Sequence, residues 1–369
     1  MARPKIFILT HEYPPKRGGA GVYCEEMSFA AKAMGHEVQS WVPQYAKDNE
    51  DVRALSLRGT QDWGCSLRLA RELRRRAEEI EGQVLHLAEP GALRAIVRFG
   101  LGQLKPSRLL ITIHGSEIPR FTQFPLERFR FRKLLRKADS IHVLSRYNKT
   151  ALTQCFPELE KKILLAPGAP SRHVLTNKLF KREKAGVLRV ITVGRLNPRK
   201  GQDRVLQALG QLDQKVKSQL EYLVVGPTIK RKYYDKLREQ SVATGIPVHF
   251  LGDLAPTELS ETYASSDLFV LTSMPTKKSV EGFGFVYLEA AAHGLPSIAH
   301  RIGGVADAVI DGETGVLVSP DKPAELTKAI ERLVLDSGLR KDLGDAALKH
   351  AARFSWEKTA RALYGEGIA

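Results

Sequence analysis

The chain alternates short segments of β-branched and other apolar residues with amphipathic segments. This alternation is typical of repeated β-strand and α-helix units, whose strands form a parallel sheet. The first series of expected strands is residues 5–9, 37–42, 84–87, 109–114 and 140–144. A second series follows at residues 188–193, 222–225, 248–251, 268–271, 296–299 and 315–318. Because the polar stretch 167–184 separates the two series, we expect two α/β domains with a linker there.

Helical patterns lie between the expected strands and at the end of the chain. A helix is expected between residues 67 and 80, where one face carries Leu69, Leu73, Ala77 and Ile80. Another is expected over residues 125–138, where one face carries Phe131, Leu134, Leu135 and Ala138. A final helix is expected over residues 357–364, because Ser355 is a residue type that caps helix N-termini.

The composition is that of an ordinary soluble globular protein, with 43% hydrophobic and 27% charged residues. The length of 369 residues favours two hydrophobic cores over one. No apolar run approaches the roughly 18 residues that span a bilayer, and the first residues show no signal peptide. The three cysteines, Cys24, Cys65 and Cys155, are far apart, which disfavours a disulfide framework or a structural zinc site. We therefore expect a cytoplasmic protein, and we expect Cys24 to be buried rather than nucleophilic.

The formal net charge of +16 is concentrated in the first half of the chain. Residues 1–178 hold 30 lysines and arginines against 18 acidic residues, a net charge of +12. The remaining residues hold 27 against 23, a net charge of +4. A basic half of this kind indicates an anionic partner, which could be nucleic acid, an anionic membrane surface or a phosphorylated substrate.

The first candidate site follows the expected strand 188–193. Gly194 and Arg195 begin a turn, and Lys200 and Gly201 end it. Arg195 offers a planar fork of hydrogen-bond donors and Lys200 a mobile point charge, which together suit a diphosphate. The alternative is a cluster of surface ion pairs.

The second candidate site contains two carboxylates eight positions apart, Glu281 and Glu289. Glu281 lies in a glycine-containing loop, and Glu289 lies about two turns into a helix that we expect to start near Gly284. Exposed amides at such a helix N-terminus bind phosphate. A carboxylate can bind the vicinal hydroxyls of a ribose, as in dinucleotide sites. The alternative is that both glutamates are solvated helix residues.

In these motifs the chain resembles the retaining GT-B glycosyltransferases of family 4, and the resemblance spans nearly the whole chain. Glu281 and Glu289 match the E-x7-E motif of that family, and Gly194–Arg195 with Lys200–Gly201 match its diphosphate signature. Further matches are Glu12-Tyr13-Pro14-Pro15 with Gly18-Gly19, Gly35-His36-Glu37-Val38, His114-Gly115-Ser116-Glu117 and Phe354-Ser355-Trp356.

The resemblance implies a fold of two facing Rossmann-like domains. It places an acceptor-binding domain at residues 1–172, a nucleotide-sugar donor domain at 173–353, and a C-terminal helix at 354–369 that crosses back to the first domain. It implies that Arg195 and Lys200 hold the donor diphosphate and that Glu289 binds the ribose. Glu281, with Phe283, Gly284 and Phe285, would orient the sugar. His114 would contact the sugar near its reacting carbon. Gly18 and Gly19 would allow the backbone to approach the phosphates.

The implied reaction is sugar transfer with retention of anomeric configuration. Negative charge develops on the leaving phosphate, so a site organised to hold that anion is the main catalytic device. The phosphate itself is expected to accept the proton of the attacking hydroxyl. The chain contains no Asp-x-Asp sequence, so we expect no metal requirement and no cofactor. The resemblance favours a UDP-sugar donor, with GDP-mannose next, and a glycan, lipid-linked or small-molecule acceptor.

One segment departs from the family pattern. Gly303-Gly304-Val305-Ala306-Asp307 stands where Gly-Gly-x-Pro-Glu is usual, which bears on the identity of the sugar and not on the class of reaction. We expect the histidines at 36, 86, 293 and 300 to be structural or superficial.

The basic helix over 125–138 indicates a further partner. Opposite its apolar face lie Arg132, Lys133, Arg136 and Lys137, and Phe129 projects onto the same side. An aromatic residue among outward cations is typical of a helix that docks on an anionic membrane. The alternative is a solvated basic face with Phe129 packed beneath arginine side chains.

Two other functions fit parts of the sequence. A nucleotide-sugar epimerase, or a phosphorylase, can share the fold, but the first lacks this arginine and lysine pair and the second needs a pyridoxal lysine in a much larger chain. A nucleic-acid-binding protein would explain the net charge, but we find no RRM, KH, zinc-finger or helix-turn-helix signature.

Overall fold

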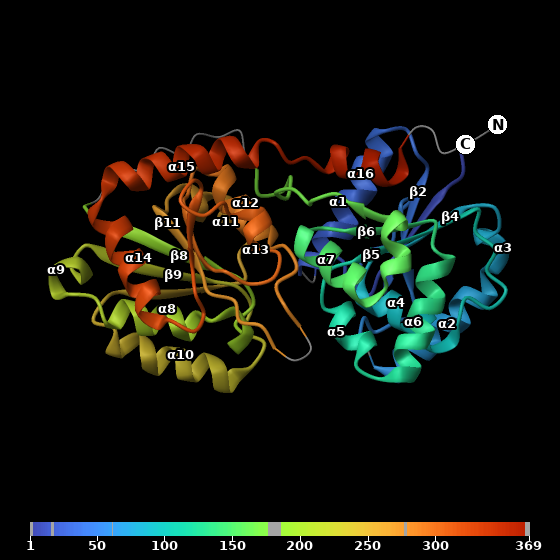
Figure 1. Cartoon of the computed structure of the whole chain (residues 1–369), viewed down its shortest axis with the longest axis horizontal. Helices are drawn as coiled ribbons and strands as arrows, with labels where there is room; N and C mark the ends of the chain where they lie inside the picture. The colour runs from blue at the N-terminus through green and yellow to red at the C-terminus, as the bar shows by residue number, and fades with distance from the viewer. Residues whose placement is uncertain (1–2, 16–17, 61, 176–185, 277–278, 366–369) are drawn as a thin grey trace. The chain divides into compact units, whose positions relative to one another are not determined.

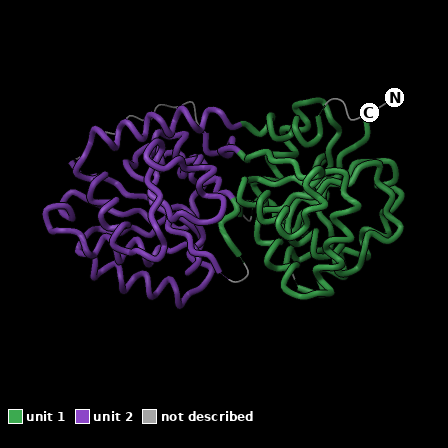
Figure 2. Tube along the Cα trace, in the orientation of Figure 1, with its two compact units in different colours: residues 1–168, 277–282, 355–369 green, residues 169–276, 283–354 purple. Residues whose placement is uncertain are grey.

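The computed structural model describes residues 3–15, 18–60, 62–175, 186–276 and 279–365. These divide into two compact units (Figure 2). Unit 1 contains Met1–Gly168, Lys277–Gly282 and Ser355–Ala369, and unit 2 contains Ala169–Thr276 and Phe283–Phe354. Unit 1 therefore receives the C-terminal helix and a short loop that carries Glu281.

Unit 1 is a seven-stranded parallel sheet with helices on both faces (Figure 1). The strand order is β3-β2-β1-β4-β5-β6-β7. The strands are β1 (Ile6–Leu9), β2 (Val38–Pro43), β3 (Val52–Leu55), β4 (Val84–Leu87), β5 (Arg108–Ile113), β6 (Ser140–Val143) and β7 (Ile163–Leu165). The helices are α1 (Gly19–Ala33), α2 (Trp63–Arg75), α3 (Ala77–Ile80), α4 (Pro90–Phe99), α5 (Glu117–Thr122), α6 (Pro125–Lys137), α7 (Arg146–Cys155) and α16 (Trp356–Tyr364).

Unit 2 repeats the architecture with six parallel strands in the order β10-β9-β8-β11-β12-β13. They are β8 (Leu188–Val193), β9 (Leu220–Val225), β10 (Val248–Gly252), β11 (Leu268–Leu271), β12 (Ser297–His300) and β13 (Gly315–Val318). The helices are α8 (Gln202–Gly210), α9 (Gln214–Lys217), α10 (Arg231–Ala243), α11 (Pro256–Ala264), α12 (Phe285–Ala292), α13 (Val305–Ala308), α14 (Pro323–Leu335) and α15 (Ser337–Ala351).

In each sheet the order in which successive strands are added reverses at one point. This point lies between β1 and β4 in unit 1 and between β8 and β11 in unit 2. In open α/β sheets, ligands bind beyond the carboxyl ends of the strands at this switch point. The central strands of each unit are buried on both faces. This burial holds the carboxyl ends of these strands in place within the unit.

The structure differs from the sequence expectations in three elements. The helix expected between residues 67 and 80 is two helices, α2 and α3, because the backbone leaves helical geometry at Arg76. Helix α2 also starts earlier, since the Asp62 side chain caps it by accepting a hydrogen bond from the Cys65 amide. The sequence missed β3 and β7, edge strands of four and three residues that are too short to show a periodic pattern.

The final helix agrees with its expected cap. Helix α16 begins at Trp356, and the Ser355 side chain accepts a hydrogen bond from the Lys358 amide. The three cysteines are free, and Cys24 is fully buried as expected. The helices in the described part of the chain include none that combines the length and the apolar composition of a membrane-spanning segment.

Candidate functional site

The loop between Gly194 and Gly201 follows β8, at the switch point of unit 2. Its Arg195 side chain is exposed, and Lys200 is half-buried. The Lys200 side chain crosses the loop, because a Cβ atom on Gly194 would lie 3.6 Å from Lys200 Cδ and Cε. Two cations are therefore presented from one short, folded loop.

Three residues outside the predicted motif hold this loop in place. The Gln202 side chain, which is fully buried, donates to the Arg195 carbonyl over 3.2 Å. The Thr272 hydroxyl, directly after β11, donates to the Gly201 carbonyl over 2.8 Å. A Cβ on Gly226, after β9, would lie 2.2 Å from the Gly194 carbonyl oxygen. The sequence analysis did not identify these residues. Gly226 could have been noticed, because it directly follows the buried strand β9 just as Gly194 directly follows β8.

Gly201 also has a conformational requirement. Its φ of 72° is left-handed, and a Cβ there would lie 2.1 Å from the Thr272 carbonyl oxygen. A larger residue would therefore be strained and would separate the cationic loop from β11.

Helix α12 starts after Gly284, whose φ of 89° is also left-handed. The start agrees with the expected one, and the Tyr287 amide of the first turn donates to the Gly284 carbonyl over 3.1 Å. Glu289 lies in α12 and is only 6% exposed. Its Oε2 accepts a hydrogen bond from the Tyr263 hydroxyl over 3.2 Å, and burial raises the pKa of that tyrosine. Glu289 is thus a buried, oriented carboxylate and not a solvated helix residue.

In unit 1, His114 follows β5 and is half-buried. Its Nε2 lies 2.9 Å from the Ala88 carbonyl oxygen, which can only accept a hydrogen bond. Nε2 therefore carries a hydrogen, and Nδ1 is the ring nitrogen that is not engaged by the Ala88 carbonyl. The His114 amide donates to the buried Glu117 carboxylate over 3.0 Å, which fixes the backbone as well.

The loop that carries Glu281 meets the His114 segment through glycines. A Cβ on Gly282 would lie 1.7 Å from the His114 carbonyl oxygen, and a Cβ on Gly115 would lie 3.2 Å from Gly282 Cα. The Asn148 side chain, fully buried in α7, donates to the Gly282 carbonyl over 3.4 Å. Unit 1 therefore brings together the Glu281-Gly282 and His114-Gly115 segments, which lie far apart in the sequence.

The predicted glycine loop has an acidic neighbour. Gly18 precedes α1 and Gly19 begins it. A Cβ on Gly18 would lie 1.5 Å from Glu12 Oε1, so the Glu12 carboxylate lies against Gly18 in this structure. Close approach of a polar group is possible here because Gly18 has no side chain, and the group that approaches is a carboxylate of the same chain.

A buried ion pair at the switch point of unit 1 holds the Glu12 loop, and the sequence did not reveal it. His11, after β1, and Glu89, after β4, are both almost fully buried, with His11 Nδ1 3.1 Å from Glu89 Oε1. Burial alone would lower the pKa of His11, but interactions with Cys65 and Glu89 raise it to about 9. Glu89 also accepts hydrogen bonds from the amides of His11, Gly91 and Ala92. Burial alone would raise the pKa of Glu89, but the interactions with His11 and with these amides lower it.

In unit 1, α6 presents an apolar and basic surface to solvent. Phe129 is 64% exposed, and Phe124 and Leu126 beside it are exposed by more than half. Phe129 is therefore not packed beneath arginine side chains. Arg132 and Arg136 both form ion pairs with Glu158, while Lys133 and Lys137 are exposed at neighbouring positions.

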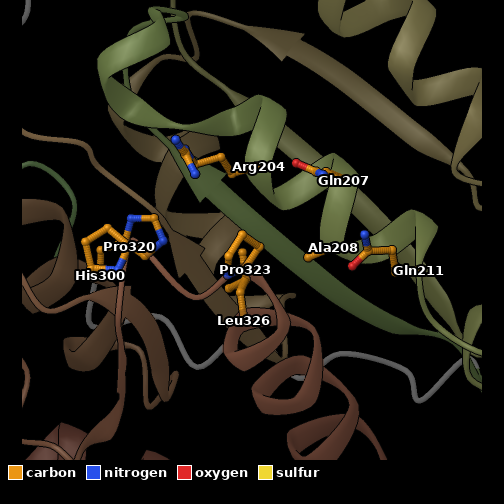
Figure 3. Close-up of a pocket in the computed structure, with 8 residues that line it drawn as sticks. All are labelled: Arg204, Gln207, Ala208, Gln211, His300, Pro320, Pro323 and Leu326. Atoms are coloured by element: carbon orange, nitrogen blue, oxygen red, sulfur yellow. The ribbon is translucent and has the colours of Figure 1, made fainter.

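A small pocket lies in unit 2 between α8 and the start of α14 (Figure 3). Arg204 and Gln207 line one side, and His300, Pro320 and Pro323 line the other. None of the predicted site residues lines this pocket. Of the predicted site residues, unit 2 contains Arg195, Lys200, Phe283, Gly284, Phe285 and Glu289, and unit 1 contains Gly18, Gly19, His114 and Glu281.

Comparison with known proteins covers both units. Residues 17–168 match the model described as Glycosyltransferase Family 4, and residues 176–350 match the model described as Glycosyl transferases group 1. A GDP-mannose-dependent alpha-(1-6)-phosphatidylinositol monomannoside mannosyltransferase from Mycolicibacterium smegmatis is 28% identical, over 95% of this chain and 94% of the relative. A D-inositol 3-phosphate glycosyltransferase from Corynebacterium diphtheriae is 35% identical over 47% of this chain and 41% of the relative.

Solved structures show the same fold. HepE from Anabaena, in complex with UDP and glucose, has a TM-score of 0.76 at 20% identity, with 98% of each chain covered. Sucrose-phosphate synthase from Thermosynechococcus elongatus has a TM-score of 0.76 at 22% identity, with 97% of this chain and 96% of that chain covered. Neither an epimerase nor a nucleic-acid-binding function receives support from these comparisons.

Proposed function

Because the chain belongs to glycosyltransferase family 4, and is a hexosyltransferase of the GT-B fold that uses a nucleotide-sugar donor, we propose that Arg195 and Lys200 bind the donor diphosphate. The supporting observation is the cationic loop at the switch point of unit 2, held by Gln202 and Thr272. A loop fixed before the reaction stabilises developing negative charge without reorganising.

The remaining roles divide between the nucleotide and the sugar. Glu289 binds the ribose hydroxyls, for which a buried and oriented carboxylate is suited, and the first amides of α12 add donors for phosphate. Glu281, Phe283, Gly284 and Phe285 orient the transferred sugar. His114 accepts a hydrogen bond from a sugar hydroxyl at Nδ1, because Nε2–H is used on Ala88.

Transfer proceeds with retention and without a metal ion in this proposal. The leaving diphosphate, held by the two cations, accepts the proton of the attacking hydroxyl on the face from which it departs. The new glycosidic bond then forms on the same face, and no protein nucleophile is required. No cofactor takes part.

The names of the relatives support one choice of donor and acceptor. The resemblance alone favoured a UDP-sugar, but the Mycolicibacterium smegmatis relative, matched over 94% of its length, is named as GDP-mannose-dependent, which favours GDP-mannose here. That name also favours a lipid-linked acceptor. The exposed Phe129 among the cations of α6 supports docking of unit 1 on an anionic membrane surface from the cytoplasmic side.

The nucleotide is identified by melting the protein with GDP, UDP and ADP. A ligand at about 100 times its dissociation constant adds roughly 2.7 kcal/mol to the free energy of unfolding. We expect GDP to raise the melting temperature most, and a response to none of the three would contradict a nucleoside-diphosphate site.

The diphosphate site is tested by replacing its cations. Arg195→Ala or Lys200→Ala should lower kcat by about 10²–10³, as for loss of one donor to a developing oxyanion. Arg231→Ala, which removes an exposed cation of α10 paired with Asp235, is the matched control and should leave kcat unchanged. Near-normal turnover in both loop variants would show that the diphosphate binds elsewhere.

A further inference from the structure

A continuous series of buried hydrogen bonds crosses unit 1 beneath His114. It runs from Tyr364 to His86 Nδ1 over 2.7 Å, from His86 Nε2 to Thr112 over 2.8 Å, and from Thr112 to Tyr23 over 2.8 Å. Tyr23 then contacts His142 Nδ1 over 2.9 Å, and His142 Nε2 contacts the Ala166 carbonyl over 2.7 Å. All five side chains are almost completely buried.

The carbonyl at one end fixes which nitrogen of His142 carries the hydrogen. A carbonyl only accepts, so His142 donates from Nε2 and its Nδ1 accepts. Burial lowers the pKa of His142 to about 4, which keeps the ring neutral. Two hydroxyls reach this Nδ1, Tyr23 over 2.9 Å and Thr112 over 3.2 Å, and the shorter contact makes Tyr23 the donor. With Tyr23 as that donor, Thr112 donates to Tyr23, His86 donates to Thr112, and Tyr364 donates to His86.

Tyr23 is the member of this series that contacts the predicted sugar-binding histidine. Its ring meets the His114 ring edge-to-face, with centroids 5.0 Å apart and planes at 89°. The Tyr23 ring is itself restrained by two other rings. It stacks on the His142 ring and meets the Trp356 ring edge-to-face. By contrast, Tyr364 makes ring contacts with His36 and His86.

We propose that Tyr23 is a positioning residue for His114. The hydrogen bonds to Thr112 and His142 hold the Tyr23 ring, and the ring together with the Ala88 carbonyl holds the plane of the His114 imidazole. Nδ1 is thereby aimed before any sugar binds. This role rests on the proposed function of His114 as a hydrogen-bond acceptor for the transferred sugar.

Three variants separate the ring of Tyr23 from its hydroxyl and from the rest of the series. Tyr23→Leu removes the ring. Tyr23→Phe removes only the hydroxyl and should fold, because Thr112 lies 3.2 Å from His142 Nδ1 and can donate there directly. Tyr364→Phe is the matched control, since it removes an equally buried hydroxyl at the far end of the series.

The test measures kcat for each variant alone and combined with His114→Ala, with melting curves and nucleoside-diphosphate binding as checks of folding. We expect Tyr23→Leu to lower kcat on the order of tenfold and Tyr23→Phe about threefold, as small errors in orientation cost rate. Tyr364→Phe should change kcat less than twofold. In the His114→Ala background all three should be nearly silent, because residues that act through one another are not additive.

Equal losses with and without His114 would overturn the proposal, as would unchanged kcat in both Tyr23 variants. Nitrogen-15 NMR of the His114 ring gives a readout independent of activity. We expect the Nε2–H signal to be retained in Tyr364→Phe and broadened in Tyr23→Leu, and a signal unchanged in Tyr23→Leu would contradict positioning. If the signal broadens but His114→Ala alone has normal turnover, the proposed role of His114 fails while its contact with Tyr23 stands.

Discussion

Glu281 and Glu289 are eight positions apart in the sequence, yet they belong to different compact units. Glu289 is buried in α12 and accepts from Tyr263, whereas Glu281, 9% exposed, precedes the glycine that packs on the His114 carbonyl. This separation supports different tasks for the two carboxylates.

Their roles are tested by calorimetry with the free nucleoside diphosphate. Glu289→Ala should weaken binding by roughly 1.5–3 kcal/mol, the usual value for charged hydrogen bonds to hydroxyls. Glu281→Ala should leave this binding nearly intact and lower sugar transfer, because its partner is absent from the free nucleotide. Equal losses of nucleotide affinity in the two variants would contradict the division.

Buried histidines make the stability of unit 1 sensitive to acid. Burial lowers the pKa of His142 to about 4, whereas the unfolded value is near 6.5. Below pH 6.5 the unfolded chain therefore binds a proton that folded His142 does not, and stability falls as the pH falls towards 4. Between pH 7 and pH 5 this histidine alone should cost about 2 kcal/mol.

Urea unfolding at pH 7 and pH 5 measures this difference. A His142→Gln variant, which keeps a donor and an acceptor at the position, should lose about 2 kcal/mol less than the wild type over this interval. The same pH dependence in both proteins would show that His142 is not a neutral link in the buried series.

At the scale of elements, strands with long buried runs were predictable. Their ends differ from the expected ones by two residues or fewer, and four of the eleven agree at both ends. Edge strands β3 and β7 were not predictable, because three or four residues carry no period. Leu69, Leu73 and Ile80 are buried as predicted. The end of α2 at Arg76 was not predictable, because the spacing of the apolar residues continues unchanged across it.

Site prediction was limited in a different way. Motif residues such as Arg195, in the turn after β8, and Glu289, within α12, belong to patterns whose spacing can be read from the sequence. Supporting residues such as Gln202, Thr272 and Tyr23 act through contacts with segments 7 to 119 positions away. No local pattern encodes such contacts, so these residues become visible only in the folded chain.

The exposed basic face of α6 predicts that the protein binds anionic membranes. Each cation near an anionic surface contributes on the order of 1 kcal/mol, which salt screens. Burial of Phe129 adds roughly 1.5–3 kcal/mol, which salt does not screen. Changing Arg132, Lys133, Arg136 and Lys137 together to glutamine should abolish binding to phosphatidylglycerol vesicles at physiological salt, and Phe129→Ser should weaken binding at every salt concentration.

Cosedimentation with a melting curve checks both effects. Since Phe129 is largely exposed, its serine variant should keep the wild-type melting temperature. Val242→Ser, on the exposed face of α10 in unit 2, is the matched control and should bind vesicles normally. Absence of wild-type binding even at low salt would mean that α6 is only a solvated basic helix.

At the scale of the whole molecule, two parallel sheets place their functional loops at equivalent points. Gly194 follows β8 in unit 2, and His11 and Glu89 follow β1 and β4 in unit 1. The donor diphosphate is assigned to the first of these points, where cations lie. The second point holds a buried ion pair that fixes the Glu12 loop against Gly18.

In the proposed reaction, fixed cations and a helix N-terminus hold the leaving diphosphate, so that the sugar is transferred with retention and without a metal ion. Proton NMR of the reaction in EDTA, with the nucleotide sugar selected by the melting panel, tests this most directly. We predict undiminished transfer, with the first-formed product in the anomeric configuration of the donor. An inverted product, or activity that EDTA abolishes and a divalent cation restores, would contradict the account.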